Sequence, residues 1–181
     1  MGLLYELFEM TSETYPIKLS TSIEDIKHVF DVYKTKPTKN VFEIKYEFKS
    51  PQYNYFVYLR DHGFYDKIPV LELAFGIYNE DREPFYDIST NENIYKTLST
   101  VFSCIMNFDK LAQKYYTNTY GENFLYILYF EGVKDDDEDF DERVDSKRTR
   151  LYKAVVEKNI KRLGIFDFEV FYNEFRLIRK Y

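Results

Sequence analysis

The apolar positions of the chain change their period several times, and each change predicts a different element. Between residues 22 and 36, apolar side chains recur at helical spacing, which predicts an α-helix with one buried face. Ser22, followed three residues later by Asp25, has the spacing of a helix capping box. We expect this helix to end before Pro37, which removes a backbone donor. A competing interpretation makes residues 28–33 a strand, and the sequence favours the helix.

Stretches with a two-residue period predict strands. From Phe42 to Phe48, apolar and charged residues alternate, which is typical of a strand with one buried and one solvated face. The pair Ser50-Pro51 should end this strand. Two more strands are expected close behind it, at 53–60 and 70–78, with a turn at Asp61-His62-Gly63 between them. Short connections between consecutive strands favour an antiparallel meander. A further short strand is expected earlier, at residues 3–9.

The second half of the chain predicts two more helices and three more strands. Helical spacing returns from Ile94 to about Tyr116 and again over residues 147–162, where Gly164 suits the position just past a helix end. The remaining stretches predict a buried central strand at 124–130 and late strands at 166–172 and 175–178. Residues 79–93 are polar and irregular.

This order of elements predicts a single α+β domain over residues 1–181. We expect one mixed, largely antiparallel sheet of six or seven strands with helices on both faces. Residues 134–146 would form a mobile acidic insertion.

Composition narrows the classes of function. The net charge is −6 and the pI is about 5.1, which makes nucleic acid an unexpected partner, because phosphate binding needs a basic surface. The 19 Tyr and 17 Phe residues have two compatible interpretations: an A+T-rich genome, or an interaction surface. Cys104 stands alone, so neither a disulfide framework nor a thiolate metal site is expected. No stretch is long enough for a membrane span and no signal peptide is recognisable, which predicts a cytoplasmic protein.

The acidic run from Asp135 to Glu142, which includes Asp136, Asp137 and Asp139, suggests a calcium loop at first sight. An EF-hand beginning at Asp135 needs Gly at its sixth place and Glu at its twelfth. Those places hold Phe140 and Ser146. We therefore expect no metal or other cofactor here, and a solvated loop whose like charges repel.

A basic cluster follows directly, at the start of a predicted helix. Lys147, Arg148 and Arg150 sit where the helix dipole disfavours cations. Two explanations stay open: the acidic loop upstream neutralises them, or they bind an external anion such as a phosphate or an acidic protein face. The candidate binding residues are therefore this cluster, Tyr152 and the three loop aspartates Asp136, Asp137 and Asp139.

Several short motifs resemble a family of uncharacterised proteins from Bacteroidota and phages. In that family a strand ending in Phe-Gly precedes an irregular loop, a helix with a Thr-Val step, a strand and an Arg-Thr-Arg-Leu-Tyr helix. The matching residues here are Ala74-Phe75-Gly76, Asn91 to Asn93, Ser99-Thr100-Val101, Phe130-Glu131-Gly132 and Arg148-Thr149-Arg150-Leu151-Tyr152. The resemblance implies phage or mobile-element ancestry and no assigned activity. It makes a virion-associated or host-cytoplasmic protein, with a protein partner or a homo-oligomeric state, the leading hypothesis.

The order of elements also resembles the N-acetyltransferase (GNAT) superfamily. Leu151-Tyr152 falls where that superfamily often has a Leu-Tyr pair, whose Tyr serves as a general acid in active members. The resemblance implies an acyltransferase using coenzyme A, with Tyr152 as the acid, as the alternative function. Residues 76–84 depart from the superfamily, because they lack the glycines of its pyrophosphate loop. A third hypothesis is an acidic decoy that acts against a nucleic-acid enzyme of the host.

Overall fold

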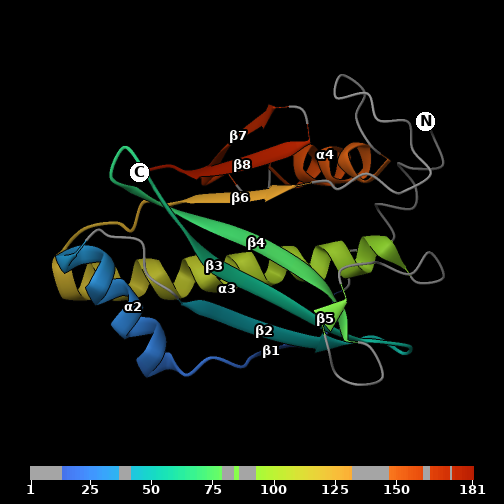
Figure 1. The fold of residues 1–181 in the computed structure, drawn as a ribbon, viewed down its shortest axis with the longest axis horizontal. Helices are drawn as coiled ribbons and strands as arrows, with labels where there is room; N and C mark the ends of the chain where they lie inside the picture. Colours follow the sequence, from blue (N-terminus) through green and yellow to red (C-terminus); the bar gives the residue numbers. More distant parts are fainter. Residues whose placement is uncertain are drawn as a thin grey trace. The chain divides into compact units, whose positions relative to one another are not determined.

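The protein is an α+β protein built on one mixed, mostly antiparallel sheet (Figure 1). The computed structural model describes residues 14–36, 42–78, 84–85, 93–131, 147–160, 164–171 and 173–181. Seven strands follow the order β1-β2-β3-β4-β6-β8-β7, and the short β5 pairs with β4. The predicted strand at 3–9 lies outside the described residues.

The chain forms two compact units, which we describe separately. Unit 1 comprises Met1–Lys36, Val41–Arg60 and Ala74–Phe124, and unit 2 comprises Pro37–Asn40, Asp61–Leu73 and Leu125–Tyr181. Two long strands, β3 (Asn54–Tyr65) and β4 (Ile68–Tyr78), run through both units.

The first described helix of unit 1, α2, spans Ile23–Thr35. The Ser22 hydroxyl accepts a hydrogen bond from the Asp25 amide at 3.1 Å and so caps the first turn. The helix stops before Pro37, as predicted. A strand at 28–33 is therefore wrong, and Phe30 and Tyr33 instead belong to the buried face of α2.

The sheet of unit 1 buries one face against the long helix α3 (Ile94–Tyr120). In β2 (Glu43–Lys49) every second residue is buried, namely Ile44, Tyr46 and Phe48. The Tyr46 hydroxyl donates to the Asn107 side chain of α3 at 3.0 Å, so this face and α3 enclose the core. β2 pairs antiparallel with β3 and with the short β1 (Ile17–Leu19).

Helix α3 runs one turn further than its apolar period predicted. It ends where Gly121 adopts a left-handed conformation, with φ 69°, and its amide donates to the Thr117 carbonyl at 3.1 Å. Glycine is the residue that tolerates this conformation best. The last turn carries Tyr116 and Tyr120, whose rings meet at 5.2 Å.

The hairpin between β3 and β4 corrects one prediction. Asp61-His62-Gly63 is not the turn but part of β3, where the Asp61 carboxylate accepts from the Gly63 amide at 2.8 Å. The turn lies at Asp66 and Lys67, which have φ values of 46° and 68°. Two successive positive φ values match the twist of a two-residue hairpin loop. The local Asp-Gly pattern was misleading because the side chain bonds within the strand.

Unit 2 completes the sheet with β6 (Ile127–Glu131), β7 (Phe166–Phe171) and β8 (Glu174–Arg179). β6 pairs parallel with Val70–Glu72 of β4 and antiparallel with β8, and β8 pairs antiparallel with β7. The predicted central strand and the two late strands are therefore confirmed, although β6 begins later than the expected residue 124.

Helix α4 (Lys147–Ile160) covers one face of the unit 2 sheet. Val155 and Val156 are buried on the helix, and Phe130 and Phe175 are buried on the strands, where their rings stack at 4.8 Å. The predicted helix at 147–162 is thus confirmed over its described length. Two short strands were missed, β1 and β5 (Pro84–Phe85), because two or three residues are too few to show a period.

Candidate binding face of unit 2

The structure describes only some of the candidate binding residues that the sequence indicated. Asp136, Asp137 and Asp139 lie outside the described residues. Lys147 and Arg148 form the first turn of α4, and nothing of their side chains is described. Arg150 is exposed on the same turn.

Tyr152 has a packing role in the structure. It is only 9% exposed, and its ring meets Phe130 at 6.2 Å and Phe175 at 6.1 Å, edge to face in both cases. This aromatic cluster joins α4 to β6 and β8, so Tyr152 helps to fix the helix on the sheet.

The opposite face of the unit 2 sheet carries polar and aromatic side chains. Residues paired across strands share a face, and every second residue of a strand lies on it. The strand register therefore defines an open face made of Val70, Glu72, Ile127, Tyr129, Glu131, Glu174, Arg176, Ile178, Asp167, Glu169 and Phe171. Most of these side chains are half-buried or exposed, in contrast to the apolar face under α4.

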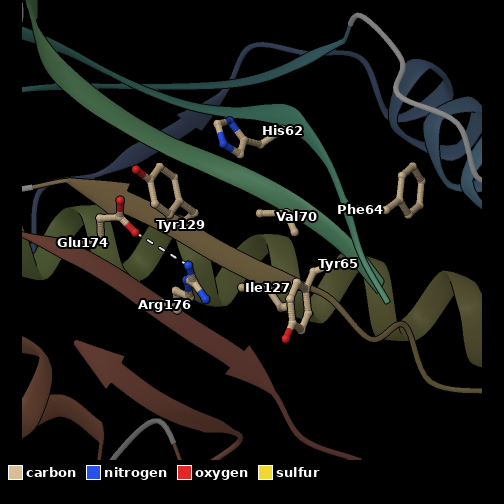
Figure 2. A pocket seen from close by; sticks show the side chains of 8 residues that line it. All are labelled: His62, Phe64, Tyr65, Val70, Ile127, Tyr129, Glu174 and Arg176. Carbon is tan, nitrogen blue, oxygen red and sulfur yellow. Dashed lines mark ion pairs between the residues drawn. The ribbon is translucent and has the colours of Figure 1, made fainter. Parts of the chain in front are cut away.

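The open face is hollowed beside the β3–β4 hairpin, as Figure 2 shows. The cavity measures about 320 Å³. Val70 and Ile127 form its apolar floor, and Tyr65, 65% exposed, stands near one end. At the other end the ring of His62 stacks on the ring of Tyr129 at 5.0 Å and 16°.

Tyr129 lies among carboxylates. Its hydroxyl donates to Glu131. The pKa of Tyr129 is raised well above its usual value, first by burial, then by the hydrogen bond to Glu131 and by the negative charges of Glu131, Glu174 and Glu72. The phenol therefore stays protonated over the physiological range, and the negative charges around it favour a cationic ligand.

A second hollow of about 520 Å³ lies towards the edge of the sheet, where Glu169, Val170, Phe171 and Arg176 line it. Arg176 borders both hollows and approaches Glu174 at 3.6 Å. Phe171 is 64% exposed. Among the described residues of the open face, acidic side chains outnumber basic ones, so this face is acidic with exposed aromatic rings.

Unit 1 has a solvated face of a different kind. Lys45 forms a 2.8 Å ion pair with Glu47 and lies 5.0 Å from the centre of the Tyr78 ring. Burial lowers the pKa of Lys45, but hydrogen bonds with Glu47 and Tyr78 raise it. Together with the nearby charges they outweigh burial, so the net shift of the pKa is upward. Glu47 also accepts from Ser20 at 2.8 Å, and its hydrogen bond with Lys45 is the main cause of its lowered pKa. These charges are satisfied by each other, which indicates a structural role.

Sequence reasoning missed the residues that define the open face, above all His62, Tyr129 and Arg176. His62 was placed in a turn, and the continuous apolar run of β6 hid the alternation of its two faces. The signal that could have found them is the period-two placement of Glu174, Arg176 and Ile178 in β8, which marks a half-exposed strand.

Three further observations bear on the class of function. Within the described ranges, no group of His, Cys, Asp and Glu side chains could hold a metal ion. Among the helices of the described residues, none is long and apolar enough to cross a membrane. No known protein family, curated protein or solved structure matches this chain.

Proposed function

We propose that the protein is a non-catalytic protein-interaction domain and that its partner docks on the open face of unit 2. The observation that carries this proposal is the combination, on one sheet face, of exposed aromatic rings and carboxylates around two hollows. Aromatic residues supply large contact area at low entropic cost, and they are enriched in interfaces. Tyr65, Phe171 and the His62–Tyr129 stack provide such area here.

The acidic character of the face favours a basic partner over a second copy of this chain. A two-fold dimer formed through the face would bring the acidic surface of one copy, which includes Glu72 and Glu131, against the same acidic surface of the second copy. Like charges brought together in this way are destabilising. The net charge of −6 adds to this repulsion.

Site-specific photo-crosslinking tests the proposal. A photoreactive amino acid replaces Phe171 or Tyr65 in the full chain, which is expressed in the cells that produce it. Both positions are exposed, so the replacement should leave the fold unchanged. We expect one discrete adduct, containing the same protein, from both positions.

The matched control carries the photoreactive residue at Ile23, an exposed apolar position on α2 of unit 1. The partner adduct should be missing from this control. The proposal is wrong if the Ile23 position yields the same adduct as the open face, or if neither open-face position yields a discrete adduct.

An acyltransferase using coenzyme A is a second candidate, and one observation favours it. The strand order β1-β2-β3-β4-β6-β8-β7, with its parallel β4–β6 pair, supports the resemblance to the GNAT superfamily. Fold likeness alone does not carry function, and residues 76–84 lack the superfamily's glycines. Calorimetry with acetyl-coenzyme A distinguishes the two candidate functions. We expect no binding with a dissociation constant below about 1 mM. Micromolar affinity, with turnover that Tyr152→Phe abolishes, would favour the enzyme instead.

A further inference from the structure

The edge of the unit 2 sheet supports a more specific inference about the partner. β7 is the last strand in the sheet order, and in the described part of the chain it pairs only with β8. An edge strand presents a row of backbone donors and acceptors to which an extended segment of another chain can bind.

The hydrogen bonds at the start of β7 show which residues direct their backbone groups outward. The Lys180 amide donates to the Ile165 carbonyl at 2.8 Å. In an antiparallel pair, hydrogen-bonded residue pairs alternate with non-bonded ones. Asp167 and Glu169, which follow Ile165 at two-residue steps, therefore bond to β8. Phe168 and Val170 direct their amide and carbonyl groups away from β8, towards the edge.

The side chains of β7 divide between the two faces in the same alternation. Asp167 and Glu169 are exposed on the open face, and Phe168 and Val170 are half-buried on the face under α4. Asp167 forms a 3.0 Å ion pair with Lys180, and both side chains are well exposed, at 66% and 43%. An exposed pair of this kind is weak and exchanges readily, so the carboxylate remains accessible to another cation.

We propose that β7 binds an extended basic segment of a partner protein as an added antiparallel strand, an inference that rests on the proposed function. Lysine or arginine side chains of that segment face Asp167 and Glu169, and apolar side chains between them cover Phe168 and Val170. Opposite charges across neighbouring strands stabilise such a pair, and like charges directly opposite destabilise it. A second copy of β7 would bring acidic residues against Asp167 and Glu169, so the edge selects against self-pairing.

The backbone register determines which residues of the added segment form hydrogen bonds with β7. Residues opposite Phe168 and Val170 form the hydrogen-bonded pairs, so the apolar residues of the added segment use their amides for binding. Residues opposite Asp167 and Glu169 form the non-bonded pairs, in which side chains approach most closely. The basic residues therefore contribute through charge and leave their own amides pointing to solvent.

A fluorescent peptide that alternates lysine and valine over the length of β7 tests this arrangement. Its binding to the full chain is measured by fluorescence anisotropy, beside two versions that carry backbone N-methyl groups on the valines or on the lysines. We expect saturable binding of the parent peptide. Methylation of the valine amides should weaken it by at least about tenfold, and methylation of the lysine amides should change it by less than about threefold.

Charge variants of the protein complete the test. Glu169→Lys should weaken binding of the parent peptide by about tenfold or more. Glu24→Lys on α2 makes the same change in net charge and should change the affinity by less than about twofold. Circular dichroism shows whether both variants are folded. If Glu169→Lys unfolds the protein, Glu169→Gln is used in its place.

The strand addition is wrong if the parent peptide shows no saturable binding up to about 1 mM. It is also wrong if methylation of the two sets of amides has equal effects, or if lysine methylation is the more damaging. These outcomes leave the crosslinking test unaffected, because a partner that docks on the open face without an added strand still gives the Phe171 and Tyr65 adducts.

Discussion

The Tyr120 hydroxyl donates a hydrogen bond to the Asp31 carboxylate at 2.5 Å and so connects the last turn of α3 to α2. Tyr115 donates to the same carboxylate oxygen at 2.7 Å. These two hydrogen bonds are the main cause of the lowered pKa of Asp31, and the bond to Asp31 raises the pKa of Tyr120 to about 12. The carboxylate thus forms a polar contact between α2 and α3.

We expect Tyr120→Phe to destabilise the protein by about 1 kcal/mol, since it removes a charge-assisted hydrogen bond at a partly solvated site. Urea denaturation measures the change. Tyr65→Phe is the control, because this ring is exposed on the hairpin, and it should leave the midpoint unchanged. Equal effects of the two substitutions would contradict the role given to Asp31.

The same pair predicts a dependence of stability on pH. The lowered pKa of Asp31 means that its contribution is present above its unfolded value of about 3.9 and is lost as pH falls through the folded pKa. The raised pKa of Tyr120 acts in the other direction. Its contribution to stability is present below the unfolded pKa of about 10, and it is lost as the pH rises through the folded pKa of about 12. Thermal melts of Tyr120→Phe across pH should therefore show a smaller dependence than wild type at both ends. Parallel curves for the two proteins would refute this account.

The β3–β4 turn predicts a stabilising substitution. Lys67 has a φ of 68° without the freedom of glycine, and the left-handed region costs an ordinary residue about 1–2 kcal/mol. Lys67→Gly should raise the melting temperature, with part of the gain offset by the greater entropy of the unfolded chain. Gly63→Ala should lower it, because Gly63 has a φ of 98°. The turn assignment fails if the two substitutions shift the melting temperature in the same direction.

The Tyr152 cluster predicts a packing role that a phenylalanine can fill. Tyr152→Phe keeps the ring against Phe130 and Phe175 and should cost no more than about 1 kcal/mol. Tyr152→Ala leaves a cavity under α4 and should cost about 3–5 kcal/mol, the range for a truncated core aromatic. Chemical denaturation measures both. A small loss for the alanine variant would show that the ring is not part of the core.

The sequence predicted the fold better than the candidate site. Amphipathic periods identified α2, α3 and α4, because burial of one helical face leaves a strong signal over several turns. Strand β2 showed the same kind of signal at a period of two. The tip of β3 was misjudged because Asp61 and Gly63 favour a turn locally, whereas pairing with β4 extends the strand through them.

The open face escaped prediction for a physical reason. Its residues come from strands that are far apart in the sequence, so His62, Tyr129 and Arg176 share a surface only after β6 pairs with β4 and β8. No local pattern encodes this pairing. The basic start of α4, with Lys147, Arg148 and Arg150, was recognisable because its residues are adjacent, and an anion site there stays a prediction.

Amide hydrogen exchange in β7, resolved to single residues by NMR, tests the central claim most directly. In the free protein the amides of Asp167 and Glu169 should be protected by β8, and those of Phe168 and Val170 should exchange rapidly. Saturation with the alternating lysine–valine peptide should protect Phe168 and Val170 and leave the protection of Asp167 and Glu169 little changed. Peptide saturation without new protection at Phe168 and Val170 would contradict binding at this edge.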